Sequence, residues 1–340
     1  MVMEQAASQS QSEIPRQVVD LWFSPNIIVI RVEDRVFRVY SDLLAARSSV
    51  FQDMIAFPPP QETNSDGNSP ENMDGYPVVQ LHDKAVEVEV FLRAIYDSSS
   101  FMPSPAPVDM KDVLAILRLS HKYDVPYLHR RALHHLVTDG WYRKTYRSDG
   151  ATEHINYIGD DSPVDGLLVA LAASEVGAHW LLPYAYYCAA THTVAKLSEP
   201  SLMEGETRDC AIKALVTHTH LVSGSLKIWG CITAQRRCAS TDRCNTIRAS
   251  SLSDLVDLLS LNSALDPLHE LDDDLDLLKT QGMCSDCFKD AEAKYHEAAT
   301  MFWDEFPQLF GLEPWTQLDA MKRAALGEEA ENSDEESESD

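Results

Sequence analysis

The stretch that decides the fold lies at residues 27–57 and reads IIVIRVEDRVFRVYSDLLAARSSVFQDMIAF. Its first half holds two runs of β-branched and aromatic residues that are separated by three polar residues at 33–35, and this pattern predicts a β-hairpin. From Ser41 onward the apolar residues recur near helical spacing until three prolines at 58–60 end the pattern. The stretch therefore predicts a hairpin followed by a helix.

One more strand and then only helices are predicted downstream. The strand at 77–81 follows a polar, flexible insertion at 58–76, and amphipathic helices are predicted at 85–96, 108–123 and 126–141. Strands that come first and helices that follow are typical of an α+β unit, whereas a parallel α/β sheet would alternate them. We therefore predict the α+β fold class for this part of the chain.

Three stretches also carry a family resemblance: residues 27–57, VVQLHDKAVEVEVFLRAIY at 78–96, and VLAILRLSHKYDVPYLHRRALHHL at 113–136. Together they resemble the BTB/POZ domain, a protein-interaction domain in which helices flank a small β-sheet, and we assign it to residues 18–141. The positions that match the family's pattern are Phe37, Val39, Leu44, Ser48, Phe51, Leu81, Asp83, Phe91, Tyr96, Lys122, Tyr123 and Val125.

The resemblance implies a protein partner and either a homodimer or a heterodimer. Two residues depart from the family's pattern: Asn26 replaces the usual aspartate, and Tyr40 replaces the usual histidine. Both positions lie near the charged pocket and the dimer surface in many members, so the departures bear on self-association rather than on the fold. The roles that the resemblance implies are an adaptor for a cullin-type ubiquitin ligase and a scaffold in transcriptional regulation.

The second half of the chain reads as helical throughout. After a polar linker at 142–163, recurring apolar residues predict an all-α domain at 164–315. We interpret residues 316–340 as a tail that is acidic and disordered from 328, because the run from 328 to 340 holds eight carboxylates and no base. The Gln- and Ser-rich residues 1–17 are likewise predicted to be disordered.

Two close pairs of cysteines are the candidate site in this half. Cys238 and Cys244 lie about forty residues before the Cys-x-x-Cys pair formed by Cys284 and Cys287. Two such pairs can supply the four soft ligands of a tetrahedral structural zinc site. Ordinary thiols remain an alternative, and a redox-active Cys-x-x-Cys is a third reading, although that chemistry favours a pair at a helix N-terminus after a βα unit and no strand is predicted before Cys284.

The remaining cysteines lie in helical patterns, and the C-terminal ending carries a second family resemblance. Cys188, Cys210 and Cys231 fall in apolar helical patterns, which indicates core positions, and Cys231 is the alternative ligand if one of the four cysteines does not bind. The stretch CSDCFKDAEAKYHEAATMFWDEFPQLFGLEPW at 284–315 is similar to the ending of a group of fungal, basidiomycete-type BTB-domain proteins. The matching residues are Trp303, Asp304, Pro307, Phe310, Gly311 and Leu312.

Composition narrows the class of function. The 54 acidic residues exceed the 28 basic ones, and the net charge of −26 argues against nucleic acid or an anionic membrane as a ligand. No secretory signal pattern is present, so we expect an intracellular protein of the nucleus or cytoplasm. No Gly-x-Ser-x-Gly or phosphate-binding glycine loop occurs either, and we expect no enzyme. The rival class is a zinc- or thiol-dependent enzyme built on the C-terminal cysteines.

Overall fold

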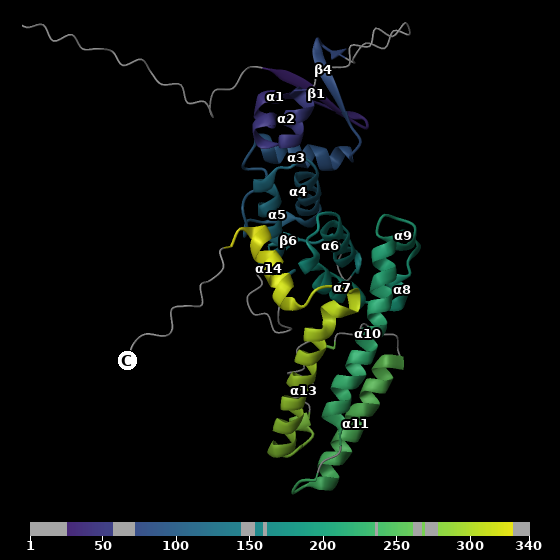
Figure 1. Ribbon diagram of the computed structural model, residues 1–340. Helices are drawn as coiled ribbons and strands as arrows, with labels where there is room; N and C mark the ends of the chain where they lie inside the picture. The colour runs from purple at the N-terminus through teal and green to yellow at the C-terminus, as the bar shows by residue number, and fades with distance from the viewer. Residues whose placement is uncertain are drawn as a thin grey trace, which may run out of the picture. The chain divides into compact units, whose positions relative to one another are not determined.

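The computed structural model describes residues 26–56, 72–143, 154–158, 162–234, 237–260, 267–268 and 278–328, with the backbone alone at 231–232 and 251–260. The predicted disordered N-terminus, most of the insertion at 58–76, the acidic run beyond 328 and the Cys231 side chain therefore lie outside the described residues. The chain divides into two compact units, Met1–Ala85 and Val86–Asp340 (Figure 1). This division falls inside the segment 18–141, whose interpretation as one domain stays a prediction.

A small sheet forms the β structure of the first unit. Strand β1 (Ile27–Val32) pairs antiparallel with β2 (Arg35–Tyr40) and parallel with β4 (Tyr76–Leu81), and the short β3 (Asn72–Met73) pairs antiparallel with β4. The strand order is β2-β1-β4-β3, so β1 is a central strand, and its apolar residues are largely buried. The predicted hairpin and the predicted strand at 77–81 are both confirmed.

Two short helices, α1 (Ser41–Arg47) and α2 (Ser49–Ala56), replace the single helix that the pattern predicts. The break falls at Ser48, whose backbone is extended, and the hydroxyl of Ser48 accepts the backbone N–H of Phe51 at 3.0 Å. This hydrogen bond satisfies one of the free amides at the start of α2, as a capping serine does. Leu44 and Phe51, one from each helix, are fully buried.

Glu33, in the turn between β1 and β2, hydrogen-bonds to the first residue of α3 (Ala85–Tyr96). Glu33 adopts a left-handed φ of 48°, and its Oε2 accepts the backbone N–H of Ala85 at 2.8 Å. A carboxylate at a helix N-terminus stabilises the helix because the free amides there carry partial positive charge. The bounds of α3 are those predicted from the sequence.

Helices α4 (Met110–Lys122) and α5 (Pro126–Thr138) pack against each other in the second unit. The predicted helix at 108–123 begins two residues late because Val108–Asp109 form a short strand, β5. That strand pairs in parallel with β6 (Ile155–Asn156), which lies inside the predicted linker at 142–163.

A buried polar cluster anchors residues 154–158 to α5. The Asp139 Oδ1 accepts the backbone N–H groups of His154 at 2.9 Å and Ile155 at 3.2 Å. His135 lies between two partners: its Nε2 is 2.8 Å from the carbonyl oxygen of Met102, and its Nδ1 is 3.0 Å from Nε2 of His154. Because a carbonyl only accepts, Nε2 of His135 is the donor to Met102, and in neutral His135 the Nδ1 therefore accepts from His154.

Small residues let α6 (Val164–Glu175) approach α7 (Leu182–Ala190) closely, with the 3₁₀ turn η2 (His179–Leu181) between them. At Gly166 an added Cβ would lie 2.8 Å from the carbonyl oxygen of Ala185 and 3.0 Å from the amide of Ala189. The short helices α8 (Val194–Leu197) and α9 (Pro200–Met203) then lead to the long helix α10 (Arg208–Thr233).

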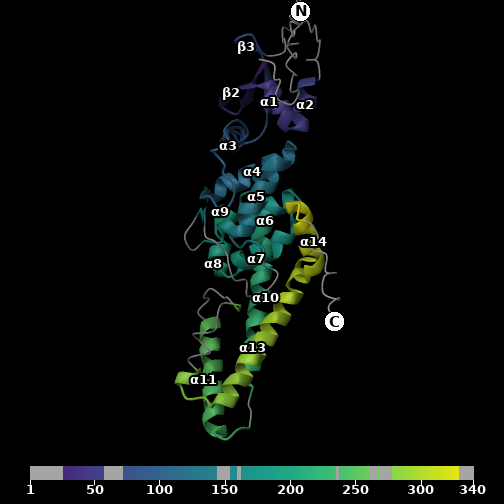
Figure 2. The same ribbon diagram turned by 90° about the vertical axis from the view of Figure 1, so that its left-hand side faces the viewer.

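Three long helices, α10, α11 (Thr241–Ser260) and α13 (Ser285–Glu305), run side by side (Figures 1 and 2). Helix α10 also packs against α7 and α9, whereas α11 and the start of α13 extend away from the other helices of the second unit. We call these three helices the three-helix extension. Helix α13 continues as the 3₁₀ segment η3 (Phe306–Phe310), and all of these helices lie within the region 164–315 that we predicted to be helical.

An aromatic cluster joins the end of α13 to α14 (Trp315–Leu326). The rings of Trp303 and Trp315 stack with centroids 5.1 Å apart, and the indole N–H of Trp315 donates to the carbonyl oxygen of Trp303 at 2.8 Å. Helix α14 lies in the stretch that we interpreted as a tail, and it buries Leu318 and Leu326. None of the described helices combines the length and apolar character needed to cross a bilayer.

Candidate metal centre

The four predicted cysteine ligands converge at the far end of the three-helix extension. The sulfur atoms of Cys238, Cys244, Cys284 and Cys287 all lie within 4.8 Å of one another. Cys244 and Cys287 are buried, and Cys238 and Cys284 are half-buried. All four are free thiols. These four cysteines lie close together and can bind a metal ion.

The loop before α11 positions the first pair. The hydroxyl oxygen of Thr241 accepts the backbone N–H of Cys238 at 3.0 Å. The same hydroxyl donates its hydrogen to the carbonyl oxygen of Cys238 at 2.7 Å. Cys244 follows in the first turn of α11, where its backbone N–H donates to the carbonyl oxygen of Ser240 at 2.9 Å. Both sulfurs are thus placed by the start of one helix.

A tight turn positions the second pair. The amide of Met283 donates to the carbonyl oxygen of Leu278 at 3.0 Å, and Gly282 between them has a left-handed φ of 93°. A Cβ on Gly282 would meet only the guanidinium of the exposed, flexible Arg243, which can move aside, so it is the backbone conformation that favours glycine. The turn delivers Cys284 to the N-cap of α13, and Cys287 lies in the first turn of that helix.

Backbone amides point at the sulfur atoms. The amide of Cys284 donates to the sulfur of Cys244 at 3.4 Å, and the amide of Ser240 donates to the sulfur of Cys238 at 3.4 Å. Hydrogen bonds of this kind favour the ionised thiolate, which is the form that binds metals. The centre therefore carries donors suited to negatively charged sulfur.

The thiols of the Cys-x-x-Cys pair differ in acidity. The backbone amide of Cys287, aided by the neighbouring thiols, lowers the pKa of Cys284 to about 7 against the opposing effect of burial. Burial raises the pKa of Cys287 to about 12. A lowered pKa at a helix N-terminus is also a property of redox-active cysteines. Unlike a simple redox pair, this pair has two further sulfurs within 4.8 Å.

Sequence reasoning missed a buried cation beside the centre. Arg248 is 1% exposed, and its Nη2 donates to the carbonyl oxygen of Cys287 at 3.1 Å. It also lies 3.5 Å from Oδ2 of Asp290, which Lys294 contacts at 3.2 Å. Four thiolates and one divalent ion carry a net charge of −2, so a buried guanidinium beside them offsets part of the charge. The sequence signal that could have indicated this position is the spacing, because Arg248 follows Cys244 by one helical turn and so lies on the same face of the helix.

Apolar residues surround the centre. Ile228, Ile247, Phe288 and Tyr295 belong to one buried cluster together with Cys244 and Cys287. The half-buried Cys238 and Cys284 pack against the same cluster. The arrangement thus joins the starts of α11 and α13 to the side of α10 in a small apolar core.

The twelve residues that match the family's pattern lie in both units. In the first, Phe37, Val39 and Asp83 are half-buried, whereas Leu44, Ser48 and Phe51 are fully buried. In the second, the ring of Phe91 stacks on that of Tyr123 with centroids 5.8 Å apart, and Nζ of Lys122 lies 5.3 Å from the Tyr123 ring. Burial raises the pKa of the half-buried Tyr96. These positions therefore act mainly in packing.

Four sulfurs at this spacing can close on one tetrahedral ion. Zn–S bonds of about 2.3 Å place the sulfurs of a tetrahedron about 3.8 Å apart, which the cysteines reach by small movements. A centre with four protein ligands leaves no open position for water or substrate, so the chemistry it supports is structural. Compared with family models, with curated proteins and with solved structures, the chain has no match.

Proposed function

We propose that this chain is a protein-interaction adaptor built on a BTB/POZ-type domain, and that its three-helix extension is fastened by a structural zinc ion. The observation that carries the first part is the topology of the first unit: a β1–β2 hairpin, two helices, and a return strand β4 that pairs in parallel with β1. This order supports the resemblance stated from the sequence, because the family's pattern also runs hairpin, helix, strand and closing helices.

Packing at the matched positions supports the same proposal. The capping bond from Ser48 to Phe51 and the buried Leu44 give these residues fold-determining roles, as expected for a family pattern. The pair Tyr123 and Val125 is also buried, and it ends α4 just before Pro126 starts α5. Partners then bind surfaces that this framework presents, and burial of apolar area drives the contact.

The adaptor proposal is tested on the purified full chain by sedimentation velocity over a range of concentrations and by titration calorimetry with a purified N-terminal domain of a BTB-binding cullin. We expect a dimer, binding to the cullin domain, or both. A chain that stays monomeric and releases no heat with the cullin domain contradicts the dimer and ligase routes together.

A matched pair of surface substitutions assigns the contact to the first unit. Val36 on the edge strand β2 is 50% exposed, and Val194 in the second unit is 39% exposed. If the adaptor surface includes the sheet edge, Val36→Glu weakens association and Val194→Glu does not. Because both valines are exposed, neither change removes core packing.

The zinc proposal follows from the ligand set. Four soft thiolates select zinc over hard cations such as magnesium or calcium, and the closed shell favours a structural role over catalysis. The rival readings, a redox-active pair or a zinc enzyme with an open position, predict different metal content and different ligands. The two proposals are separate, and each can fail without the other.

Elemental analysis of the reduced protein tests the metal directly. We expect about one zinc per chain, lost in the Cys284→Ala/Cys287→Ala variant and retained in Cys188→Ala, which removes a half-buried thiol outside the centre. Metal-free wild-type protein that keeps its helical signal would contradict the zinc proposal. Recovery of a reversible disulfide between Cys284 and Cys287 would favour the redox reading instead.

A further inference from the structure

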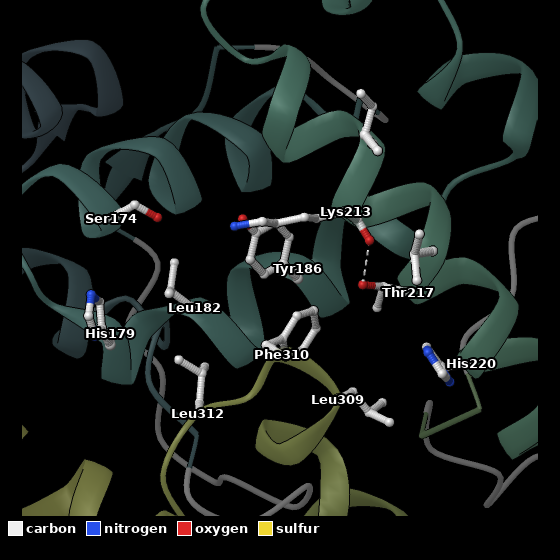
Figure 3. Close-up of a pocket in the computed structure, with 12 residues that line it drawn as sticks. Ser174, His179, Leu182, Tyr186, Lys213, Thr217, His220, Leu309, Phe310 and Leu312 are labelled. Atoms are coloured by element: carbon white, nitrogen blue, oxygen red, sulfur yellow. Dashed lines mark hydrogen bonds between the residues drawn. The ribbon is translucent and has the colours of Figure 1, made fainter.

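A cavity of about 510 Å³ opens in the second unit, away from the cysteines (Figure 3). It lies between α7, the first half of α10 and the segment that follows α13. Its size falls within the range of about 300–1,000 Å³ that is typical of small-molecule sites. Neither the adaptor proposal nor the zinc proposal uses it.

One side of the cavity is apolar. The ring of Phe310 stacks on that of Tyr186 with centroids 4.9 Å apart, and the two rings lie near the middle of the view in Figure 3. Around them, Ile212, Val216 and Leu309 line the cavity although they are 43%, 53% and 39% exposed. Exposed apolar groups gathered around one hollow favour a ligand that covers them.

Among the described residues that line the cavity, Lys213 is the only lysine, arginine, aspartate or glutamate. His179 and His220 line it as well, and none of the described lining residues carries a carboxylate, although the chain holds 54 acidic residues. Glu175, the carboxylate next to the lining residue Ser174, is bound by Arg118, with Nη2 and Oε1 3.2 Å apart. The lining itself therefore offers a ligand one lysine and no carboxylate, although Asp209, one helical turn before Lys213, is near enough to act on the lining residue Tyr186.

Lys213 is the cation best placed to meet an anionic ligand. Its Nζ lies 5.9 Å from the centre of the Tyr186 ring, and it makes no ion pair with any residue in the described part of the chain. In Figure 3 its side chain reaches across the cavity above Tyr186. The hydroxyl of Thr217, one turn later, is already used because it donates to the carbonyl oxygen of Lys213 at 2.8 Å.

We propose that this cavity binds a small amphipathic carboxylate, whose apolar body covers Val216, Leu309 and Phe310 and whose carboxylate pairs with Lys213. The apolar body supplies most of the binding free energy through burial, and the ion pair selects for the anion. The inference is independent of the proposed function, since it uses neither the first unit nor the cysteines.

The test compares three ten-carbon probes on the full chain: decanoate, decan-1-ol and decylammonium. The alkyl body is the same in each, so calorimetry isolates the effect of the head group. We expect decanoate to bind about tenfold more tightly than decan-1-ol, because a charge-assisted contact adds about that factor, and decylammonium to bind weakest. Methyl NMR signals of Ile212, Val216 and Leu309 should shift, which locates the probe.

Three substitutions of Lys213 test the ion pair directly. Lys213→Gln should remove the preference for decanoate, Lys213→Arg should keep it, and Lys213→Glu should reverse it toward decylammonium. Lys227→Gln changes an exposed lysine on the same helix outside the cavity and should have no effect. Lys213 is exposed, so circular dichroism should show each variant folded.

Four outcomes overturn the proposal. Decanoate that does not bind shows that the cavity has no affinity for this class. Equal affinity for decanoate and decan-1-ol would show that Lys213 does not pair with the carboxylate. A preference for decanoate that persists in Lys213→Glu would show the same. Methyl shifts confined to residues outside the cavity place the probe elsewhere.

Discussion

The amide of Cys284 donates a hydrogen bond to the sulfur of Cys244 over 3.4 Å, although forty residues separate the two in sequence. This contact joins the N-cap of α13 to the first turn of α11. Together with the carbonyl oxygen of Cys287, which accepts from Arg248, it makes the start of each helix depend on the other.

Removal of the proposed zinc ion should therefore loosen the three-helix extension and leave the rest of the second unit folded. The buried cluster around the cysteines is small, and small cores depend on a metal or another cross-link. After treatment with a strong zinc chelator we expect loss of helical signal and a new, lower-temperature step in the thermal unfolding curve.

Limited proteolysis provides the second readout for the chelated protein. New cleavage sites should fall in α11 and the first half of α13, and the aromatic cluster around Trp303 and Trp315 should stay resistant. Identical melting and cleavage before and after chelation would mean that no metal fastens the extension.

Substitution of Arg248 by Met should lower both stability and metal affinity. The change removes a buried donor to Cys287 and a partner of Asp290, which costs about 2 kcal/mol. Loss of an outer-shell contact typically weakens metal binding by about 10- to 100-fold. Competition with a chromophoric chelator measures the second effect, and urea unfolding the first.

Arg243→Met is the matched control for Arg248. Arg243 lies in the same helix, but it is exposed and its contact with the carbonyl oxygen of Gln281 is 3.4 Å long. We expect a small effect on metal affinity. Equal losses in the two variants would show that the burial of Arg248 has no special role.

Substitution of two helical glycines by alanine should change the free energy of unfolding in opposite directions. At Gly166 a methyl group would meet backbone atoms of α7, which cannot move aside easily, so Gly166→Ala should destabilise by about 1–3 kcal/mol. At Gly230 nothing lies within 4 Å, so Gly230→Ala should stabilise α10 by about 0.5–1 kcal/mol. Denaturant unfolding of both variants checks the signs, and destabilisation by both would contradict the close packing of α6 on α7.

Stability should fall as the pH drops below about 6.5, in part because of His135. Burial lowers the pKa of this histidine below its ordinary value of 6.5, so the unfolded chain takes up a proton that the folded chain excludes. The contribution of His135 is therefore fully present above pH 6.5 and declines as the pH falls toward the folded pKa.

His135→Gln isolates that contribution. At pH 7.5 the variant should be less stable than the wild type by about 1–3 kcal/mol, because buried hydrogen bonds are lost. At pH 5.5 the difference should be smaller. Burial also lowers the pKa of His129, but His129 is present in both proteins and its effect cancels. A constant difference across this range would rule out His135 as a source of the pH dependence.

The sequence predicted those elements whose signals are local. The hairpin at 27–40 and the helix at 85–96 follow from period-two and helical patterns within a few residues, and both are confirmed. The break at Ser48 was not predicted, since the apolar spacing continues across it and the interruption lies in the extended backbone of Ser48, whose hydroxyl then caps α2. Helix α14 was missed because the neighbouring acidic run outweighed the spacing of Leu318 and Leu326.

The candidate site, too, could be predicted from the sequence only where its signals are local. Spacing within each cysteine pair was readable, and the expected meeting of the two pairs is seen in the structure. Arg248 was not foreseen, because its burial depends on how α11 packs rather than on its neighbours in sequence. The cavity around Lys213 was not foreseen either, since its walls come from helices that are far apart in the chain.

Asp139 has a further consequence for the short segment at 154–158. Its carboxylate accepts two successive backbone amides, and Asp165 accepts the amide of Ile158 at 3.0 Å. Exchange of these three amide hydrogens with deuterated solvent should be slow, as in a helix, although only two residues of the segment form a strand. Exchange of the first two amides then reports how often the segment opens at the C-terminal end of α5, and exchange of the Ile158 amide reports opening at the start of α6.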